Sequence, residues 1–157
     1  FGNHFYLPAD FETIKWYGRG PGESYSDRFT SAFVGEYKGK IIDQYYPYVR
    51  PQESGNKIDV RYGEILRNDG TGFRIEMTDA PLNINAILYS IDQLFPGMEK
   101  TQTHSGELEP DKFVHLDIDL VQYGIGGINS WGALPLEKYR LPYQSYNYSY
   151  RIIPIAE

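Results

Sequence analysis

Hydrophobic and polar residues alternate in five segments of the chain, which is the pattern of β-strands that bury one face. In the second segment, Ile58, Val60 and Tyr62 are expected on the same face. Such alternation in segments spread along the chain predicts an all-β fold. The five segments are residues 11–18, 57–67, 72–79, 113–126 and 146–155.

One short helix is expected near residues 90–95. Ser90 suits its N-cap and Asp92 its first turn, and the pair Pro96–Gly97 would end it. Sequences typical of turns separate the other segments. Antiparallel strands joined in this way predict a two-sheet β-sandwich, and the length fits a single domain, residues 1–157.

The composition narrows the classes of function. With a net charge of −6 and no basic block, nucleic acid is not an expected partner. No apolar run reaches the roughly 18 residues of a membrane span, so no membrane partner is expected either. The absence of cysteine excludes disulfides, zinc–thiolate sites and cysteine nucleophiles. A soluble protein is expected, and the cytoplasm and the periplasm both stay open as its compartment.

The acidic and imidazole side chains show no spacing that defines a catalytic or metal site. Asp117 and Asp119 would lie roughly 7 Å apart on one strand, a spacing compatible with a catalytic pair. Any strand with a polar face shows this spacing, so we interpret the two residues as part of a solvated or hydrogen-bonded face. The histidines lack metal-ligand spacing, and no metal site is expected from His4, His104 and His115.

Aromatic residues make up 16% of the chain and include 15 tyrosines. Tyrosine favours strands and also suits half-wet binding surfaces. Polar and aromatic residues gather in two stretches, WYGRGPGESYSDR (16–28) and YYPYVRPQESGN (45–56). Such groups can bind a sugar, but an Arg–carboxylate pair can equally pin a long loop. The candidates are Arg19, Glu23, Tyr25, Asp27 and Arg28 in the first stretch, and Tyr45, Tyr46, Tyr48, Arg50, Gln52, Glu53 and Asn56 in the second.

The stretch GIGGINSWG, residues 124–132, places a tryptophan among four glycines. Gly126–Gly127 permit a tight loop, and Asn129 and Ser130 can hydrogen-bond the backbone of that loop. Trp131 is therefore expected to stand out on a shaped loop instead of packing in the core.

These motifs, in this order and together with the tail YRLPYQSYNYSYRI, resemble the C-terminal domain of the lactose-cleaving β-galactosidases of glycoside hydrolase family 2. The resemblance covers nearly the whole chain, most specifically residues 16–28, 45–55 and 124–131. It implies a large two-sheet supersandwich, related to galactose mutarotase-like folds, of which this chain is the C-terminal part. The catalytic barrel of the family, with its two catalytic glutamates and its metal ligands, is expected to lie outside these residues. No catalytic residue and no cofactor is therefore expected here, although the parent family uses metal ions bound by other domains.

The resemblance also assigns a role to Trp131, whose ring would offer an aromatic face to a β-galactoside sugar held by the catalytic barrel of the same polypeptide. Ile128 and Asn129 stand where the family often has acidic residues, which leaves the side contacts of the loop open. The implied function is that of a β-galactosidase domain, inactive alone, in an enzyme that hydrolyses terminal β-D-galactose residues. A stand-alone carbohydrate-binding module and a purely structural or interface domain are the alternatives. Self-association of the isolated chain across an exposed sheet edge is also expected.

Overall fold

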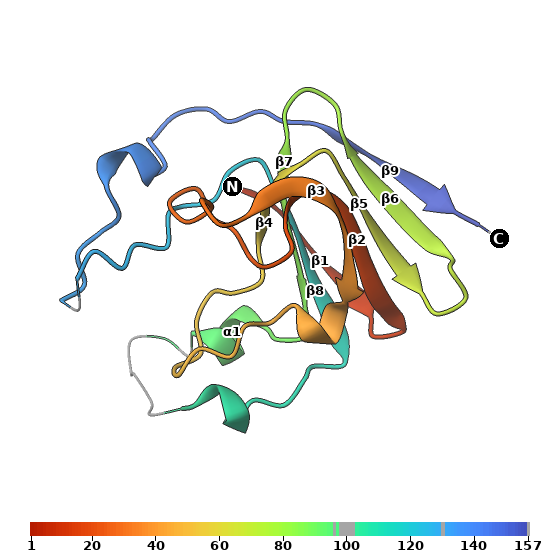
Figure 1. Cartoon of the computed structure of the whole chain (residues 1–157), viewed down its shortest axis with the longest axis horizontal. Coiled ribbons are helices and arrows are strands. Elements are labelled where there is room, and N and C mark those ends of the chain that lie inside the picture. The colour runs from red at the N-terminus through yellow and green to blue at the C-terminus, as the bar shows by residue number, and fades with distance from the viewer. Residues whose placement is uncertain (96, 98–102, 130, 157) are drawn as a thin grey trace.

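Two antiparallel sheets pack face to face in the computed structural model, which describes residues 1–95, 97, 103–129 and 131–156 (Figure 1). The all-β sandwich predicted from the sequence is confirmed. The four-stranded sheet contains, in spatial order, β1 (Gly2–Pro8), β8 (Phe113–Asp119), β7 (Leu82–Ile87) and β4 (Lys57–Val60). The five-stranded sheet contains β3 (Phe33–Lys40), β2 (Phe11–Gly20), β5 (Tyr62–Arg67), β6 (Gly72–Met77) and β9 (Tyr150–Ile155).

The short helical elements lie in the connections between strands. The α-helix α1 (Ile91–Leu94) confirms the helix expected near residues 90–95. The Ser90 hydroxyl caps it by accepting a hydrogen bond from the Gln93 amide, and Asp92 lies in its first turn. Pro96, expected to end the helix, lies outside the described residues. The described residues also contain three 3₁₀ turns: η1 (Ile41–Asp43), η2 (Ser105–Glu107) and η3 (Glu137–Tyr139).

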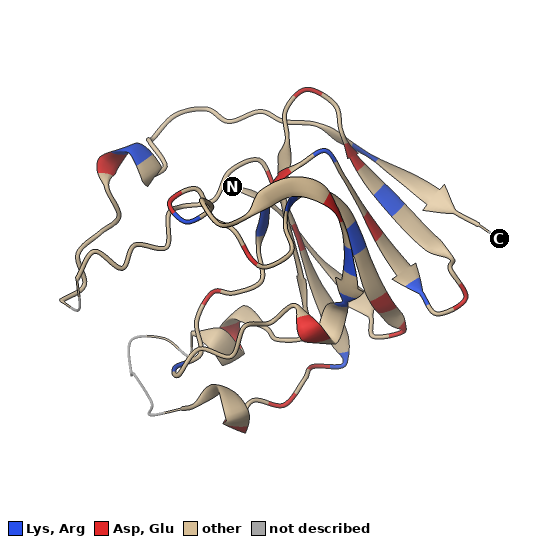
Figure 2. Ribbon diagram, in the orientation of Figure 1, with Lys and Arg blue, Asp and Glu red and all other residues tan. Residues whose placement is uncertain are grey.

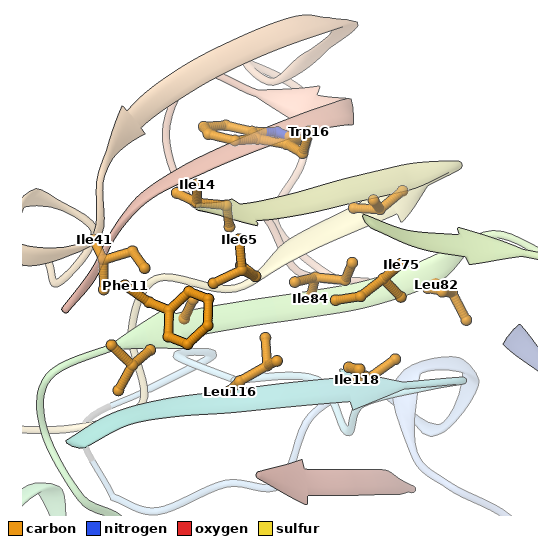
Figure 3. Close-up of a cluster of buried hydrophobic side chains, with 13 residues drawn as sticks. Phe11, Ile14, Trp16, Ile41, Ile65, Ile75, Leu82, Ile84, Leu116 and Ile118 are labelled. Carbon is orange, nitrogen blue, oxygen red and sulfur yellow. The ribbon is translucent and has the colours of Figure 1, made fainter. Parts of the chain in front are cut away.

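The hydrophobic core fills the space between the two sheets (Figure 3). Apart from Ile41 of η1, it is built from side chains that alternate along the strands, and most of them are fully buried. Burial of each such side chain stabilises the fold by about 1.5–3 kcal/mol. Its members are Phe11, Ile14, Trp16, Ile41, Val60, Ile65, Ile75, Leu82, Ile84, Ala86, Val114, Leu116 and Ile118.

One predicted strand is wrong, and two are shorter than predicted, since β8 ends at Asp119 and not at residue 126 and β9 begins at Tyr150 and not at residue 146. Residues 57–67 do not form a single strand, because the chain passes from β4 in one sheet to β5 in the other at Arg61. Asp59 adopts a positive φ of 57°, which breaks the regular extension of β4. Val60 and Tyr62 therefore belong to different sheets, and they do not share a face with Ile58.

Charged residues recur along the strands of the five-stranded sheet (Figure 2). Lys15 of β2 and Arg74 of β6 both pair with Glu64 of β5, at 3.4 Å and 2.6 Å respectively. This ladder of ions faces solvent, as one side of an antiparallel sheet commonly does.

Loops cover the outer face of the four-stranded sheet. The side chain of Asn85, on β7, donates a hydrogen bond to the Ser54 carbonyl at 2.9 Å, which places the 44–56 connection on this face. The segment that follows β8 leaves the sheets as a long irregular excursion before it returns as β9 (Figure 1). Within the described residues, no helix is both long and apolar enough to cross a membrane.

Candidate functional site

Glu23 joins the two polar-aromatic stretches. Its Oε1 accepts hydrogen bonds from Arg28 Nη2 and from the Tyr48 hydroxyl. Its Oε2 accepts from the Gly55 amide at 2.7 Å and from the Tyr25 hydroxyl at 3.4 Å. Donors from both stretches thus meet on one carboxylate, which matches the loop-pinning alternative for Glu23.

The backbone around Gly55 explains why the second stretch reaches Glu23. Gly55 has a φ of +87°, and a Cβ there would meet the Gln44 carbonyl oxygen at 2.8 Å, so only glycine fits without strain. The Gly55 carbonyl accepts from Lys57 Nζ at 2.5 Å. Lys57 is 2% exposed, and this burial lowers its pKa to about 8.

Glu53 lies over the outer face of the four-stranded sheet, where it contacts Asn85 of β7. Its carboxylate accepts from the Tyr25 hydroxyl at 3.3 Å and from Asn85 Nδ2 at 3.4 Å. Burial, reinforced by the negative charges of Asp117 and Asp119, raises the pKa of Glu53 to about 7. Burial, followed by the carboxylates of Glu53 and Glu23, also raises the pKa of Tyr25 well above its usual range.

Asp27 connects the first stretch to the glycine-rich loop. Its carboxylate accepts from the Ile125 amide at 3.2 Å and from the Gly126 amide at 2.9 Å. Gly126 and Gly127 have φ values of +78° and +86°, the left-handed conformation that glycine adopts readily. The base of the loop is therefore anchored by a charge-assisted contact 99 residues away in sequence.

Trp131 stands fully out from the fold, with 92% of its surface exposed. Asn129 Oδ1 accepts from the Trp131 amide at 2.8 Å and from the Ala133 amide at 3.4 Å, so the asparagine braces the loop from within. Ser130, the other side chain expected to do so, lies outside the described residues.

A cavity of about 670 Å³ opens at the base of this loop. It brings together the two polar-aromatic stretches and the glycine-rich loop, which are far apart in sequence. Both acidic and basic side chains face it, along with amides and one phenol, so it offers varied hydrogen-bonding partners. Its lining residues are Asp27, Arg28, Gln52, Glu53, Gln122, Tyr123, Gly124, Ile125, Gly126 and Gly127.

Two candidate arginines lie apart from this cavity. Arg19 Nε contacts Asp59 Oδ2 at 2.5 Å, and its Nη1 donates to the Ala32 carbonyl at 2.9 Å. Its guanidinium also lies over the Phe29 ring. Arg50 is exposed in the 44–56 connection and does not line the cavity. Among the described residues, no group of three or more His, Cys, Asp or Glu side chains is arranged to hold a metal ion.

Sequence reasoning did not single out Gln122 or the pairing of His4 with Asp117. Gln122 donates a hydrogen bond to Glu53, which lowers the pKa of that carboxyl in opposition to its burial. His4 Nδ1 lies 2.6 Å from Asp117 Oδ1, because the register of β1 against β8 sets these residues opposite each other. The strand face of Asp117 and Asp119 was expected to be solvated or hydrogen-bonded, and it is hydrogen-bonded at Asp117. Only the strand register could have revealed that His4 is the partner.

The fold and the site define an all-β sandwich unit that carries an exposed tryptophan on an anchored loop beside a polar cavity. The family model described as "Beta galactosidase small chain" matches residues 1–152, and the chain belongs to this family.

Three curated relatives illustrate the match. The chain is 36% identical to a β-galactosidase of Priestia megaterium over 155 residues, which is 98% of this chain and 14% of that protein. It is 36% identical to a β-galactosidase of Halalkalibacterium halodurans over 141 residues, 90% of this chain and 13% of that protein. It is 28% identical to a β-galactosidase of Streptococcus thermophilus over 156 residues, 99% of this chain and 15% of that protein. The chain therefore spans only 13–15% of the length of these relatives.

Proposed function

We propose that the chain is a non-catalytic sandwich unit of a β-galactosidase and works together with a catalytic domain of the same enzyme. The support is its membership of the small-chain family and the small share of its relatives' length that it spans. The catalytic carboxylates and any metal ions are supplied by the rest of that enzyme, and these residues hold no cofactor.

The role of this unit is to complete the rim of the active site with the ring of Trp131. The observation that carries this proposal is a 92% exposed tryptophan on a loop that Asp27 and Asn129 hold in shape. Leaving so large an apolar ring in water brings no folding benefit, so the ring is available for a galactoside held by the catalytic domain. Stacking on one sugar face would contribute about 1–2 kcal/mol, from about 25 cal/mol per Å² of apolar area.

The test is hydrolysis of a nitrophenyl β-galactoside by the complete enzyme that contains this chain. Trp131→Ala should lower kcat/KM about 5- to 30-fold, the equivalent of 1–2 kcal/mol, and Trp131→Phe should restore much of the loss. Tyr143→Ala is the matched control, because this tyrosine is fully exposed on the same excursion. An unchanged kcat/KM in Trp131→Ala would remove the role assigned to the ring.

The isolated chain should hydrolyse no galactoside, because the family's catalytic glutamates are expected outside it. Turnover that survives repurification would contradict the proposed division of labour. The isolated chain should also self-associate through β1, which is an edge strand of its sheet with Tyr6 65% exposed. Sedimentation velocity at rising concentration tests this, and a clean monomer throughout would refute it.

The alternative of a carbohydrate-binding module has one observation in its favour, namely that Arg28 and Glu53 both line the 670 Å³ cavity. In that case galactose or lactose would bind the isolated chain, and Arg28→Ala would weaken the binding. Calorimetric titration at high millimolar sugar decides between this alternative and a purely structural unit.

A further inference from the structure

A second cavity, of about 200 Å³, lies on the outer face of the four-stranded sheet. It is separate from the base of the Trp131 loop, and of the residues that line that first cavity it shares only Glu53. Strands β1, β7 and β8 form its floor, and the segment that leads into α1 forms a wall. Its lining residues are His4, Tyr6, Glu53, Asn85, Ile87, Tyr89, Ile91, Leu94, His115 and Asp117.

A chain of contacts fixes the two histidines of this cavity. His4 contacts Asp117 at 2.6 Å through Nδ1 and His115 at 3.4 Å through Nε2. His115 is 3% exposed, and its Nε2 lies 3.0 Å from Asp111 Oδ2. Both ring nitrogens of each histidine are therefore engaged, and the imidazole planes are held in place before any ligand arrives.

The floor of the cavity contains a polar side chain that the 44–56 connection holds in place. Asn85 is 3% exposed, and its Nδ2 donates to the Ser54 carbonyl and to Glu53. Its Oδ1 is buried and has no hydrogen-bond partner among the described residues. This oxygen is closed to solvent and lies against the 44–56 connection, where a Cβ on Gly55 would meet it at 2.9 Å. The amide therefore fixes the floor of the cavity, and the acceptors that face a ligand are the carboxyls of Glu53 and Asp117.

The mouth of the cavity is aromatic and half open. Tyr6 is 65% exposed and packs edge-on against His4 and His115, with ring centroids 4.8 Å and 5.2 Å apart. Tyr89 also lines the cavity and packs against the Tyr45 ring, with ring centroids 4.5 Å apart. A ligand here would meet ring faces and aliphatic side chains on its sides and polar atoms at its deep end.

These features select the class of ligand. A volume of about 200 Å³ is below the roughly 300 Å³ at which drug-sized ligands are accommodated, so the ligand contains about one ring. The carboxylates of Glu53 and Asp117 disfavour anions, and no metal-binding group of three acidic or histidine side chains occurs in the part of the chain that is described. Polar floor and apolar walls together suit a molecule with hydroxyls on its edge and C–H groups on its faces.

We propose that this cavity binds a single neutral sugar ring, as a carbohydrate site distinct from the Trp131 loop. The deep hydroxyls of the ring hydrogen-bond the carboxyls of Glu53 and Asp117, and its C–H face lies against Tyr6. Because none of these groups belongs to the Trp131 loop, the site operates whether or not that loop serves the active-site rim.

The test uses the histidines of the isolated chain as reporters. Of the three histidines, His4 and His115 line the cavity and His104 does not. Their ring carbon–proton NMR signals are followed while D-galactose or D-glucose is added to about 200 mM, since an affinity on the order of 10 mM is reasonable for so small a ligand. The expected result is a saturable shift of the His4 and His115 signals with at least one of the two sugars, while the His104 signal stays in place.

Two variants and one charged probe sharpen the test. Tyr6→Ala should weaken the binding at least 5-fold, whereas Tyr143→Ala and Trp131→Ala should leave it unchanged. D-galacturonate should bind far more weakly than the neutral sugars. The proposal is overturned if neither sugar shifts His4 or His115, if all three histidines drift together without saturation, or if galacturonate binds as well as galactose. It is also overturned if Tyr6→Ala retains a folded spectrum and full affinity.

Discussion

Replacing Glu53 by glutamine should remove a large part of the pH dependence of folding. The carboxyl is mostly buried beside Tyr25 and Asn85, and its pKa rises from 4.5 to about 7 in the folded chain. The folded state therefore binds this proton more tightly than the unfolded state does. By linkage, this group does not change the free energy of unfolding below pH 4.5. It lowers that free energy as the pH rises from 4.5 to 7, and the loss is complete above pH 7, where the buried carboxyl is charged.

The size of the effect follows from the shift. A difference of about 2.5 units between 4.5 and about 7 corresponds to about 3 kcal/mol at pH 8, since one unit is worth about 1.4 kcal/mol. Glutamine keeps an acceptor for Tyr25 but carries no charge, so Glu53→Gln does not bear this penalty. Asp119, whose pKa burial raises to about 6, leaves a residual slope in the same direction.

Urea unfolding of the parent and of Glu53→Gln at pH 4.5 and pH 8 measures this directly. The stability difference between the two proteins should move by about 3 kcal/mol in favour of the variant between these pH values. Glu12→Gln, at an exposed position of β2, is the matched control and should follow the parent at both pH values. Parallel stabilities for the parent and Glu53→Gln would refute the account of a buried, destabilised carboxylate.

Further outcomes follow from the loop anchor and the core. Asp27→Asn should loosen the Gly124–Gly132 loop, because it removes the charge from the acceptor of two backbone amides. Limited proteolysis should then cleave near Trp131 faster than in the parent, with a loss of about 1 kcal/mol or less in overall stability, and an unchanged cleavage rate would argue against the anchor. Ile65→Ala should lower the free energy of unfolding by about 2–5 kcal/mol, because this side chain is 0% exposed in the core, and a loss below 1 kcal/mol would show a loosely packed interior. Trp131→Ala should leave the melting temperature of the isolated chain unchanged, because the ring is 92% exposed, and a clear fall would show that the ring packs against the fold.

The fold class could be predicted because alternation reports directly which strand face is buried. Ile75 of β6 and Leu116 of β8 lie inward as the pattern indicates. The pattern could not reveal where the chain changes sheets, which depends on the positive φ of Asp59 and on pairing with distant strands. The strands β1, β3 and β7 were also not foreseen, although β7 carries a strand pattern of its own, in which Leu82, Ile84 and Ala86 alternate with Asn83 and Asn85.

The candidate site was foreseen as residue types but not as an arrangement. The exposed position of Trp131 and the bracing by Asn129 follow from local turn chemistry, which sequence shows well. The convergence of Asp27 on Gly126 and the opposition of His4 and Asp117 join residues about 100 positions apart. Such contacts are set by strand register and loop closure, for which a single sequence carries no local signal.

Fluorine NMR of the complete enzyme labelled with 5-fluorotryptophan tests whether the ring of Trp131 contacts the galactoside, as we propose. The Trp131 signal is assigned by its loss in the Trp131→Phe variant, and a non-hydrolysable thio-β-galactoside is then added to saturation. We predict that this signal shifts with the occupancy of the active site, while the signal of Trp16, which is 2% exposed in the core, does not. A Trp131 signal that stays unchanged while the thio-galactoside binds would contradict the account.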